Sequence, residues 1–504
     1  MPPTSPIPTT AVPASLRNRD EAIAFLLGRI NYERTPLVPY GQRHLKLDRM
    51  RQLLTRLGNP DAGLPIVHVA GTKGKGSTAA LIAAVLTAAG YDAGLFSSPH
   101  LDAIEERFAV NGLPCSADEL ATLVERLRPI VQAMDHEADV SGDSSLSPTY
   151  FELTTAIALM HFAQRQVDVA VLEVGLGGRL DSTNVCQPAV TVITSISLDH
   201  TKQLGNSLAQ IAAEKAGIIK PGVPLLCGPL DDEPRRVIAE IARQHGCRML
   251  ESGYDFRHSY QPPRGLDRAD SWGRLDFQSC GSDGTFQLNH VPLRMAGEHQ
   301  AANAALALAT AVELRRQGWL ISTDAMHEAL SNLALPARGE VICRRPTVVL
   351  DVAHNVASTR ALADLLRESF ACENRTLLLA ATRDKDVAGI VRELVPHFRR
   401  VVVSEYQENP RAVPTAKLAQ LIRAEFKRLG RCNAAGCVVE APQPVDAWKL
   451  VASSTGPDEL ICITGSFFIA AELRRVLLTD PAMLASAEST TFVRSTAPDS
   501  SRDR

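Results

Sequence analysis

A glycine-rich segment with two lysines, Gly71-Thr-Lys-Gly-Lys-Gly-Ser77, has the composition of a phosphate-binding loop. It follows the apolar run 65–70, which is typical of a buried strand, and it precedes an Ala- and Leu-rich stretch of helical period. At such a turn, backbone N–H groups and the helix N-terminus converge on an anion, and glycines let the main chain approach it closely. The pattern predicts that Lys75 reaches the terminal phosphates of a nucleotide, and that the hydroxyl of Ser77 or Thr78 assists phosphate or metal binding.

The match to the standard pattern G-x-x-x-x-G-K-[ST] is incomplete. That pattern needs Gly at position 69 and Ser or Thr at position 76, where the chain has Val69 and Gly76. Taken alone, the segment also fits a tight turn that binds nothing. The residues predicted to contact phosphate are Gly71, Thr72, Gly74, Lys75, Gly76 and Ser77.

Carboxylates end two further apolar runs, where oxygen ligands for a metal would be needed. Glu173 closes the buried run 169–173 and is followed directly by a glycine-rich turn. Because the carboxyl ends of parallel strands meet at one sheet edge, Glu173 is expected beside the phosphate loop as a Mg²⁺ ligand. The alternative is a carboxylate that only caps the strand. Asp199-His200 ends another run in the same way, and here a purely structural histidine is the stronger alternative.

Apolar runs that alternate with helical periods define an α/β protein with mainly parallel sheets. In the first part we expect a P-loop-type domain with a small antiparallel excursion between residues 245 and 296. From residue 348 the alternation restarts, which predicts a smaller, Rossmann-like C-terminal domain. The predicted boundaries are a disordered tail at 1–16, an ATP-binding domain at 17–335, a hinge at 336–340, the C-terminal domain at 341–479 and a second disordered tail at 480–504.

Composition narrows the functional classes. The chain has 504 residues, 45% of them hydrophobic, and a formal net charge of −3, which gives no general reason to bind nucleic acid or an anionic membrane. No window approaches 18 apolar residues, so no membrane span is expected. The ten cysteines show no zinc-binding spacing, and the N-terminus has no secretory pattern. We read the cysteines as reduced thiols of a cytoplasmic protein.

Several motifs occur in the order in which they stand in folylpolyglutamate and dihydrofolate synthases, a family of the wider Mur ligase superfamily. Between Tyr32 and Leu478 the chain resembles that family closely, and LEVGLGGRLDSTN followed by EKAGI is its most specific part. The motifs are GTKGKGS at 71–77, SSPHL at 97–101, LEVGLGGRLDSTN at 172–184, LDH at 198–200, EKAGIIK at 214–220, GEHQAANA at 297–304 and DVAHN at 351–355.

The resemblance implies ATP and Mg²⁺ as cofactors, with the nucleotide between the domains. It assigns Lys75 to the ATP phosphates and Lys215 to a site that is typically N6-carboxylated in the family. Catalytic roles are implied for Lys75, Lys215, Arg338 and His354. The metal ligands would be Ser98, Glu173 and His200. Asn303 would meet the adenine, Arg338 the γ-phosphate, Asp351 the nucleotide from the second domain, and His354 and Ser466 would form the face that receives glutamate.

The chain departs from the family pattern at three positions. Lys73 stands where the loop usually has Asn, and Val352 and Val356 replace the Gly and Pro of the usual D-G-A-H-N-P. Lys73 adds positive charge beside the phosphates, and the two valines could shift His354. None of these changes removes a group that the chemistry requires.

The expected reaction is the addition of L-glutamate to a folate, with dihydropteroate as a further acceptor, through an acyl phosphate made from ATP. The nearest alternative is a Mur-type ligase that adds an amino acid to a cell-wall precursor, against which the folate-branch motifs speak. A GTP-binding switch lacks support, because the sequence has no Asn-Lys-x-Asp motif. A non-catalytic nucleotide-binding protein is disfavoured by the metal-site residues. We expect a monomer.

Overall fold

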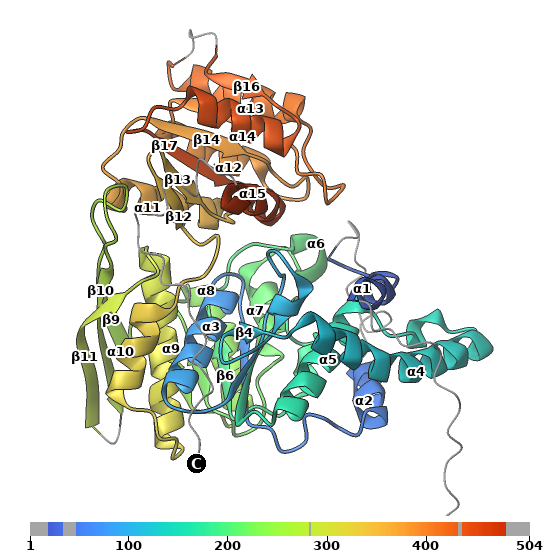
Figure 1. Ribbon diagram of the computed structural model, residues 1–504. Coiled ribbons are helices and arrows are strands. Elements are labelled where there is room, and N and C mark those ends of the chain that lie inside the picture. The colour runs from blue at the N-terminus through green and yellow to red at the C-terminus, as the bar shows by residue number, and fades with distance from the viewer. Residues whose placement is uncertain (1–18, 34–46, 282–283, 432–435, 480–504) are drawn as a thin grey trace, which may run out of the picture.

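The computed structural model describes residues 19–33, 47–281, 284–431 and 436–479 (Figure 1). The tails predicted at residues 1–16 and 480–504 lie outside these ranges. Within them the strands form an eight-stranded, a three-stranded and a six-stranded sheet. The six-stranded sheet and its helices stand above the other two in Figure 1. The predicted α/β class is confirmed, as are the mainly parallel first sheet, the antiparallel excursion and the C-terminal α/β domain.

The large sheet has the strand order β4-β3-β2-β5-β1-β6-β7-β8. Neighbours from β2 to β8 pair in parallel, and β3 and β4 pair antiparallel at one edge. The parallel strands therefore end at a common edge. The bounds are β1 (Ile66–Ala70), β2 (Ala93–Phe96), β3 (Phe108–Val110), β4 (Leu113–Pro114), β5 (Val169–Glu173), β6 (Val190–Ile193), β7 (Leu225–Cys227) and β8 (Met249–Glu251).

Helices cover both faces of this sheet. Because strand side chains alternate, Val67 and Val69 of β1 pack with α3, α9 and α10, whereas Ile66 packs with α1, α2, α4 and α5 on the other face. None of the helices within the described ranges is long and apolar enough to cross a membrane. The helices are α1 (Arg19–Leu27), α2 (Leu47–Arg56), α3 (Lys75–Ala88), α4 (Ala117–Ser141), α5 (Tyr150–Arg165), α6 (Thr201–Leu204), α7 (Leu208–Ala216), α8 (Asp232–Gln244), α9 (Glu298–Arg316) and α10 (Thr323–Asn332).

The antiparallel sheet is a three-stranded meander that packs against α9. It contains β9 (Phe256–Gln261), β10 (Gly273–Gly281) and β11 (Gly284–Leu293). The predicted excursion began at residue 245, which is too early, because β8 still extends the large sheet in parallel to β7. β8 has only three residues and no fully buried side chain, so its sequence lacks the apolar run of the other parallel strands.

The C-terminal sheet has the order β12-β13-β17-β14-β15-β16, and β12 alone among these strands runs antiparallel to its neighbour. Helices α11, α12 and α13 cover one face, and α14 and α15 cover the other. The elements are β12 (Glu340–Arg344), β13 (Thr347–Leu350), α11 (Val356–Ser369), β14 (Arg375–Leu379), α12 (Val387–Leu394), β15 (Arg400–Val403), α13 (Thr415–Arg428), β16 (Val438–Glu440), α14 (Pro444–Ser454), β17 (Leu460–Thr464) and α15 (Phe467–Thr479).

Two segments join the C-terminal domain to the rest on the side of α9 and α10. The first is the linker 333–339 between α10 and β12. The second is the β9–β10 loop, residues 262–272, whose Leu266 is 7% exposed and packs in the core of the C-terminal domain. The Leu266 backbone N–H donates to the Ser369 carbonyl (2.9 Å), and Arg344 pairs with Asp270 at 2.6 Å. Figure 1 shows the upper end of this sheet reaching α11.

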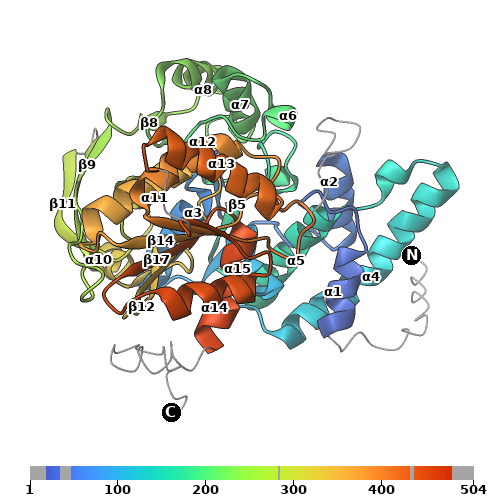
Figure 2. The same ribbon diagram turned by 90° about the horizontal axis from the view of Figure 1, so that it is seen from above.

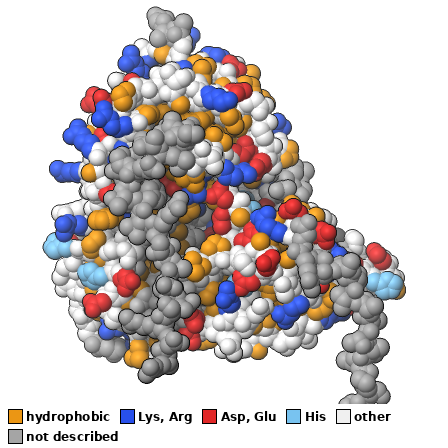
Figure 3. Space-filling model, viewed as in Figure 1, with side chains coloured by type: hydrophobic (Ala, Val, Ile, Leu, Met, Phe, Trp, Pro, Cys, Tyr) orange, Lys and Arg blue, Asp and Glu red, His pale blue; other side chains and the backbone are white. Residues whose placement is uncertain are grey.

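The C-terminal domain lies over the carboxyl edge of the large sheet and leaves α1, α2 and α4 to one side (Figure 2). On the face seen in Figure 3, charged side chains of both signs gather where the C-terminal domain meets the rest of the molecule. Both observations direct attention to this junction.

Candidate active site

The loop between β1 and α3 has a backbone shaped by glycine. Gly74 has φ 83°, and a Cβ there would lie 2.2 Å from the Asn303 side-chain oxygen, so only glycine fits. The Thr72 N–H donates to the Ser195 carbonyl (2.7 Å), and the Thr194 hydroxyl donates to the Lys73 carbonyl (2.6 Å). The loop is thus anchored to the chain after β6 and leads into the N-terminus of a 14-residue helix, where an anion is stabilised.

Glu173 stands directly opposite this loop. Strands β1 and β5 are parallel neighbours in which Val69 pairs with Glu173, so both chains emerge at the same edge. A Cβ placed on Gly76 would lie 3.3 Å from a carboxylate oxygen of Glu173, and the same oxygen accepts the Ser98 N–H (3.1 Å). Burial raises the pKa of Glu173, and the charge of Lys75 opposes that shift. The structure therefore brings the phosphate loop and the carboxylate together.

Two further predicted residues flank the loop. Lys215 is 5% exposed and donates to the Gly71 carbonyl (2.8 Å). Burial lowers the pKa of its amine well below the ordinary value, and the charge of Lys75 lowers it further. His200 lines the same cavity, and burial together with the charge of Lys385 lowers its pKa to about 4. His200 is therefore neutral near pH 7, the state that a metal-binding imidazole requires.

The C-terminal domain brings its own predicted residues to the junction. The Asp351 carboxylate accepts the Gly339 and Ala353 N–H groups, each at 2.7 Å, and burial raises its pKa to about 6. Burial lowers the pKa of Arg338, and the charges of Asp351 and Glu173 oppose this. Arg338 therefore lies in the field of one carboxylate from each domain.

His354 and Ser466 face the same space. The His354 Nδ1 lies 2.8 Å from the Val352 carbonyl, which can only accept, so Nδ1 carries the proton and Nε2 presents a lone pair. The Ser466 hydroxyl is buried 3.4 Å from that of Thr382.

Most of these residues line one cavity of about 580 Å³. Three predicted residues do not line it. Ser77 is buried in α3, Asn303 is half-buried beside Gly74, and Asp351 accepts the backbone N–H of Gly339, next to Arg338. The lining residues from the prediction are Gly71, Thr72, Gly74, Lys75, Gly76, Ser98, Glu173, His200, Lys215, Arg338, His354 and Ser466.

The cavity is also lined by aromatic side chains that the sequence did not single out. Tyr150 and Phe151 line it, next to Arg107, which is fully buried and donates both terminal nitrogens to Glu33 at 2.8 and 2.7 Å. From the sequence Arg107 would be interpreted as a surface charge, because no local pattern indicates that this side chain is enclosed.

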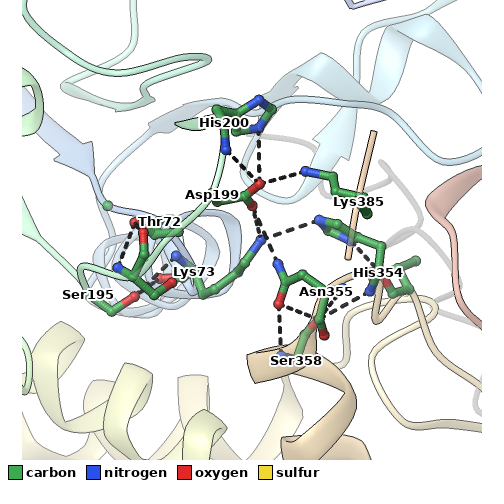
Figure 4. A network of polar contacts seen from close by, with 12 residues as sticks. Thr72, Lys73, Ser195, Asp199, His200, His354, Asn355, Ser358 and Lys385 are labelled. Carbon is green, nitrogen blue, oxygen red and sulfur yellow. Dashed lines mark hydrogen bonds and ion pairs between the residues drawn. The ribbon is translucent and has the colours of Figure 1, made fainter. Parts of the chain in front are cut away.

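A charged network at the junction was also missed (Figure 4). One oxygen of Asp199 pairs with Lys73 at 2.6 Å, and the other pairs with Lys385 of the C-terminal domain at 2.6 Å. The two lysines hold the pKa of Asp199 well below its usual range, against the effect of burial. The only signal for Lys385 was a charged run, 383–386, that is separated from the end of β14 by three residues.

The predicted metal ligands fit a hard cation that also binds water and substrate oxygens. No cluster of three or more His, Cys, Asp or Glu side chains able to hold a metal occurs among the residues that the structure describes. Mg²⁺ is commonly held by one or two protein oxygens together with water and substrate phosphates. Glu173, whose carboxylate faces the loop at Gly76, suits that arrangement, with Ser98 and His200 beside the same cavity.

Comparison with known proteins agrees with this geometry. Residues 69–311 match the Mur ligase middle domain, and residues 337–467 match the Mur ligase, glutamate ligase domain. The chain is 34% identical to the dihydrofolate synthase/folylpolyglutamate synthase of Bacillus subtilis over 86% of this chain and 94% of that protein. A Mycobacterium tuberculosis folylpolyglutamate synthase complexed with ADP superposes with a TM-score of 0.79 at 31% identity, covering 92% of this chain and 99% of that one. E. coli FolC in complex with DHPP and ADP gives 0.73 at 28% identity, covering 92% and 99%.

The fold, the phosphate loop and the two matched domains define an ATP-dependent ligase of the Mur type. The identity to the bacterial relatives extends over most of both chains. The chain belongs to the folylpolyglutamate synthase/dihydrofolate synthase family, as its motifs indicated.

Proposed function

We propose that the protein uses ATP to join L-glutamate to the carboxylate of a folate, and that dihydropteroate is a second acceptor. The observation that carries the proposal is the β1–β5 register, which sets Glu173 against the phosphate loop inside a cavity shared with His354 and Ser466. The relatives support the substrates, since one solved structure holds ADP and another holds DHPP and ADP. The folate-branch relatives disfavour a cell-wall ligase.

The cavity suits a substrate with a flat ring and an acidic tail. The half-buried Phe151 offers an aromatic face in the cavity, and Lys75 and Arg338 supply positive charge there. A substrate that spans the cavity would place its carboxylate beside the phosphate loop. The protein would thus hold the acceptor carboxylate close to the nucleotide, and this positioning would contribute to catalysis in addition to charge stabilisation.

A carboxylate oxygen of the acceptor attacks the γ-phosphorus of ATP, the bond to ADP breaks, and an acyl phosphate forms. Lys75 and Arg338 offset the charge on the transferred group. The amine of glutamate then attacks the acyl carbon, its proton is lost, and phosphate leaves. His354 lines the cavity at the face where this amine would arrive, and its ring is fixed by the hydrogen bond from Nδ1 to the Val352 carbonyl. Mg²⁺, held by Ser98, Glu173 and His200, would neutralise charge on the phosphates.

Carboxylation of Lys215 on Nζ would turn a buried amine into an anion beside the metal ligands. Burial lowers the pKa of this amine, which supports the modification because only the neutral amine attacks carbon dioxide. Nuclear magnetic resonance after equilibration with isotopically labelled bicarbonate should show a carbamate carbon in the wild type and none in Lys215→Ala. Identical spectra would remove this part of the proposal.

The proposed reaction is tested by incubating the protein with ATP, Mg²⁺, labelled glutamate and either tetrahydrofolate or dihydropteroate. Amide product and ADP should form in equal amounts. Lys75→Ala should abolish both products, and the matched control Lys427→Ala, on the exposed surface of α13, should not. ADP release without amide product from either acceptor would refute the folate assignment. Cytoplasmic location, a monomeric state, the domain boundaries and closure about the 336–340 hinge stay predictions.

A further inference from the structure

The side chain of Lys73 belongs to the phosphate loop but leads away from it (Figure 4). Its backbone is fixed on both sides. The Lys73 N–H donates to the Ser195 hydroxyl (3.1 Å), and its carbonyl accepts from Thr194 (2.6 Å) and from Ser195 (3.1 Å). The backbone position from which the Lys73 side chain extends is therefore fixed, and the ammonium group reaches a defined place.

That place is the junction of the two domains. The Lys73 Nζ lies 2.6 Å from an Asp199 oxygen and 3.3 Å from the His354 Nε2. Because the His354 Nδ1 donates its proton to Val352, the Nε2 lone pair is the acceptor, and Lys73 is the donor. The imidazole ring is thus held at both nitrogens, by its own backbone and by a residue of the other domain.

The Lys385–Asp199 pair lies beside this contact and does not replace it. Lys385 and Asn355 of the C-terminal domain also donate hydrogen bonds to Asp199, at 2.6 and 3.4 Å, but neither side chain is hydrogen-bonded to the His354 ring. Loss of Lys73 would leave the domains linked through Asp199 and would free one nitrogen of His354. The loss of Lys73 is therefore expected to change the position of the His354 ring and not the contact between the domains.

We propose that Lys73 is a positioning residue that holds His354 in place for attack by the glutamate amine, rather than a ligand of the ATP phosphates. This inference rests on the proposed function, because it takes His354 as part of the glutamate face. Lys73 acts through the ring that it orients, so its removal affects the amine step and not nucleotide binding.

The test uses Lys73→Met, which keeps the length of the side chain but removes its donors. ATP affinity, measured by calorimetry on the full chain, should change by less than about threefold. The kcat/KM for glutamate should fall by roughly tenfold or more, the loss expected for one charge-assisted hydrogen bond. Lys73→Arg, which restores a donor, should recover part of it. In a His354→Ala background Lys73→Met should have little further effect, because the two act as one unit.

A spectroscopic measurement separates this inference from the proposed reaction. The imidazole nitrogen signals of the wild type should show His354 as the Nδ1–H tautomer with a hydrogen-bonded Nε2, assigned with His354→Ala. In Lys73→Met the Nε2 signal should shift, whether or not the protein makes an amide product. An unshifted Nε2 signal, a tenfold loss of ATP affinity with normal glutamate kinetics, or full additivity with His354→Ala would each overturn the positioning role.

Discussion

Replacing Glu152 by Gln should destabilise the packing of α2 against α5 strongly. The Arg49 Nε donates to both oxygens of Glu152, at 2.9 and 2.8 Å, and the two side chains are 3% and 7% exposed. At 2.8 Å the gross attraction is about 6 kcal/mol with an effective dielectric constant near 20, and desolvation offsets much of it. Removing the Glu152 charge leaves the guanidinium in a buried site, which costs about 3–5 kcal/mol. We expect about 3 kcal/mol, because glutamine keeps one acceptor.

Hydrogen exchange of the α2 backbone amides is the appropriate assay, because α2 carries the arginine of both pairs and exchange reports local opening in a protein with more than one domain. A loss of about 3 kcal/mol corresponds to roughly a hundredfold faster exchange. The matched control is Glu137→Gln. Glu137 pairs at 2.8 Å with Arg56 at the other end of α2, where the side chains are 55% and 33% exposed. Such a pair contributes less than about 1 kcal/mol.

The comparison decides whether burial governs the strength of these pairs. If both variants accelerated exchange by the same small factor, the buried pair would be no stronger than the exposed one, and the reasoning would be wrong. A hundredfold effect in the control would be equally damaging.

Three further predictions concern the site and the domain contact. Lys75→Ala and Glu173→Ala should each abolish turnover while the circular dichroism spectrum stays unchanged, and normal activity in either would refute their roles. Because the pKa of Asp351 is raised to about 6, its carboxylate is protonated as the pH falls through that value. Below pH 6 the value of kcat/KM should therefore fall, and the decrease should approach tenfold per pH unit. This decrease at acid pH should be absent in Asp351→Asn. Leu266→Ala should lower the unfolding free energy of the C-terminal domain by about 2–3 kcal/mol in urea titrations, whereas Trp272→Ala, in the same loop but 52% exposed, should change it by less than about 1 kcal/mol.

Much of the fold could be predicted because local pattern and topology agree. The apolar runs that became β1 and β5 are fully buried, and the rule that parallel strands end at one edge placed Glu173 near the loop. β12 was missed because this edge strand begins with Glu340 and ends with Arg344, which leaves an apolar run of only three residues. Glu340 had been assigned to the predicted hinge.

The parts of the site that were missed depend on contacts between distant segments. Lys73 and His354 are 281 residues apart, and no spacing rule links them. Fully buried Arg107 and nearly buried Arg49 read as surface charges, since a sequence does not reveal that a carboxylate from another element will enclose them. The roles assigned to Asn303 and Asp351 came from family resemblance and stay predictions, since neither residue lines the cavity described above.

The Leu266 contact gives the C-terminal domain a second support besides the linker 333–339. Polar contacts join the two parts on the other side of the molecule, where Arg411 donates to the Glu33 carbonyl and Arg474 pairs with Asp102, each at 2.8 Å. Any separation of the domains must therefore break partly exposed polar contacts on one side or withdraw a leucine from an apolar core on the other. Burial of a leucine contributes about 1.5–3 kcal/mol and an exposed ion pair less than about 1 kcal/mol, so the polar side is the weaker of the two.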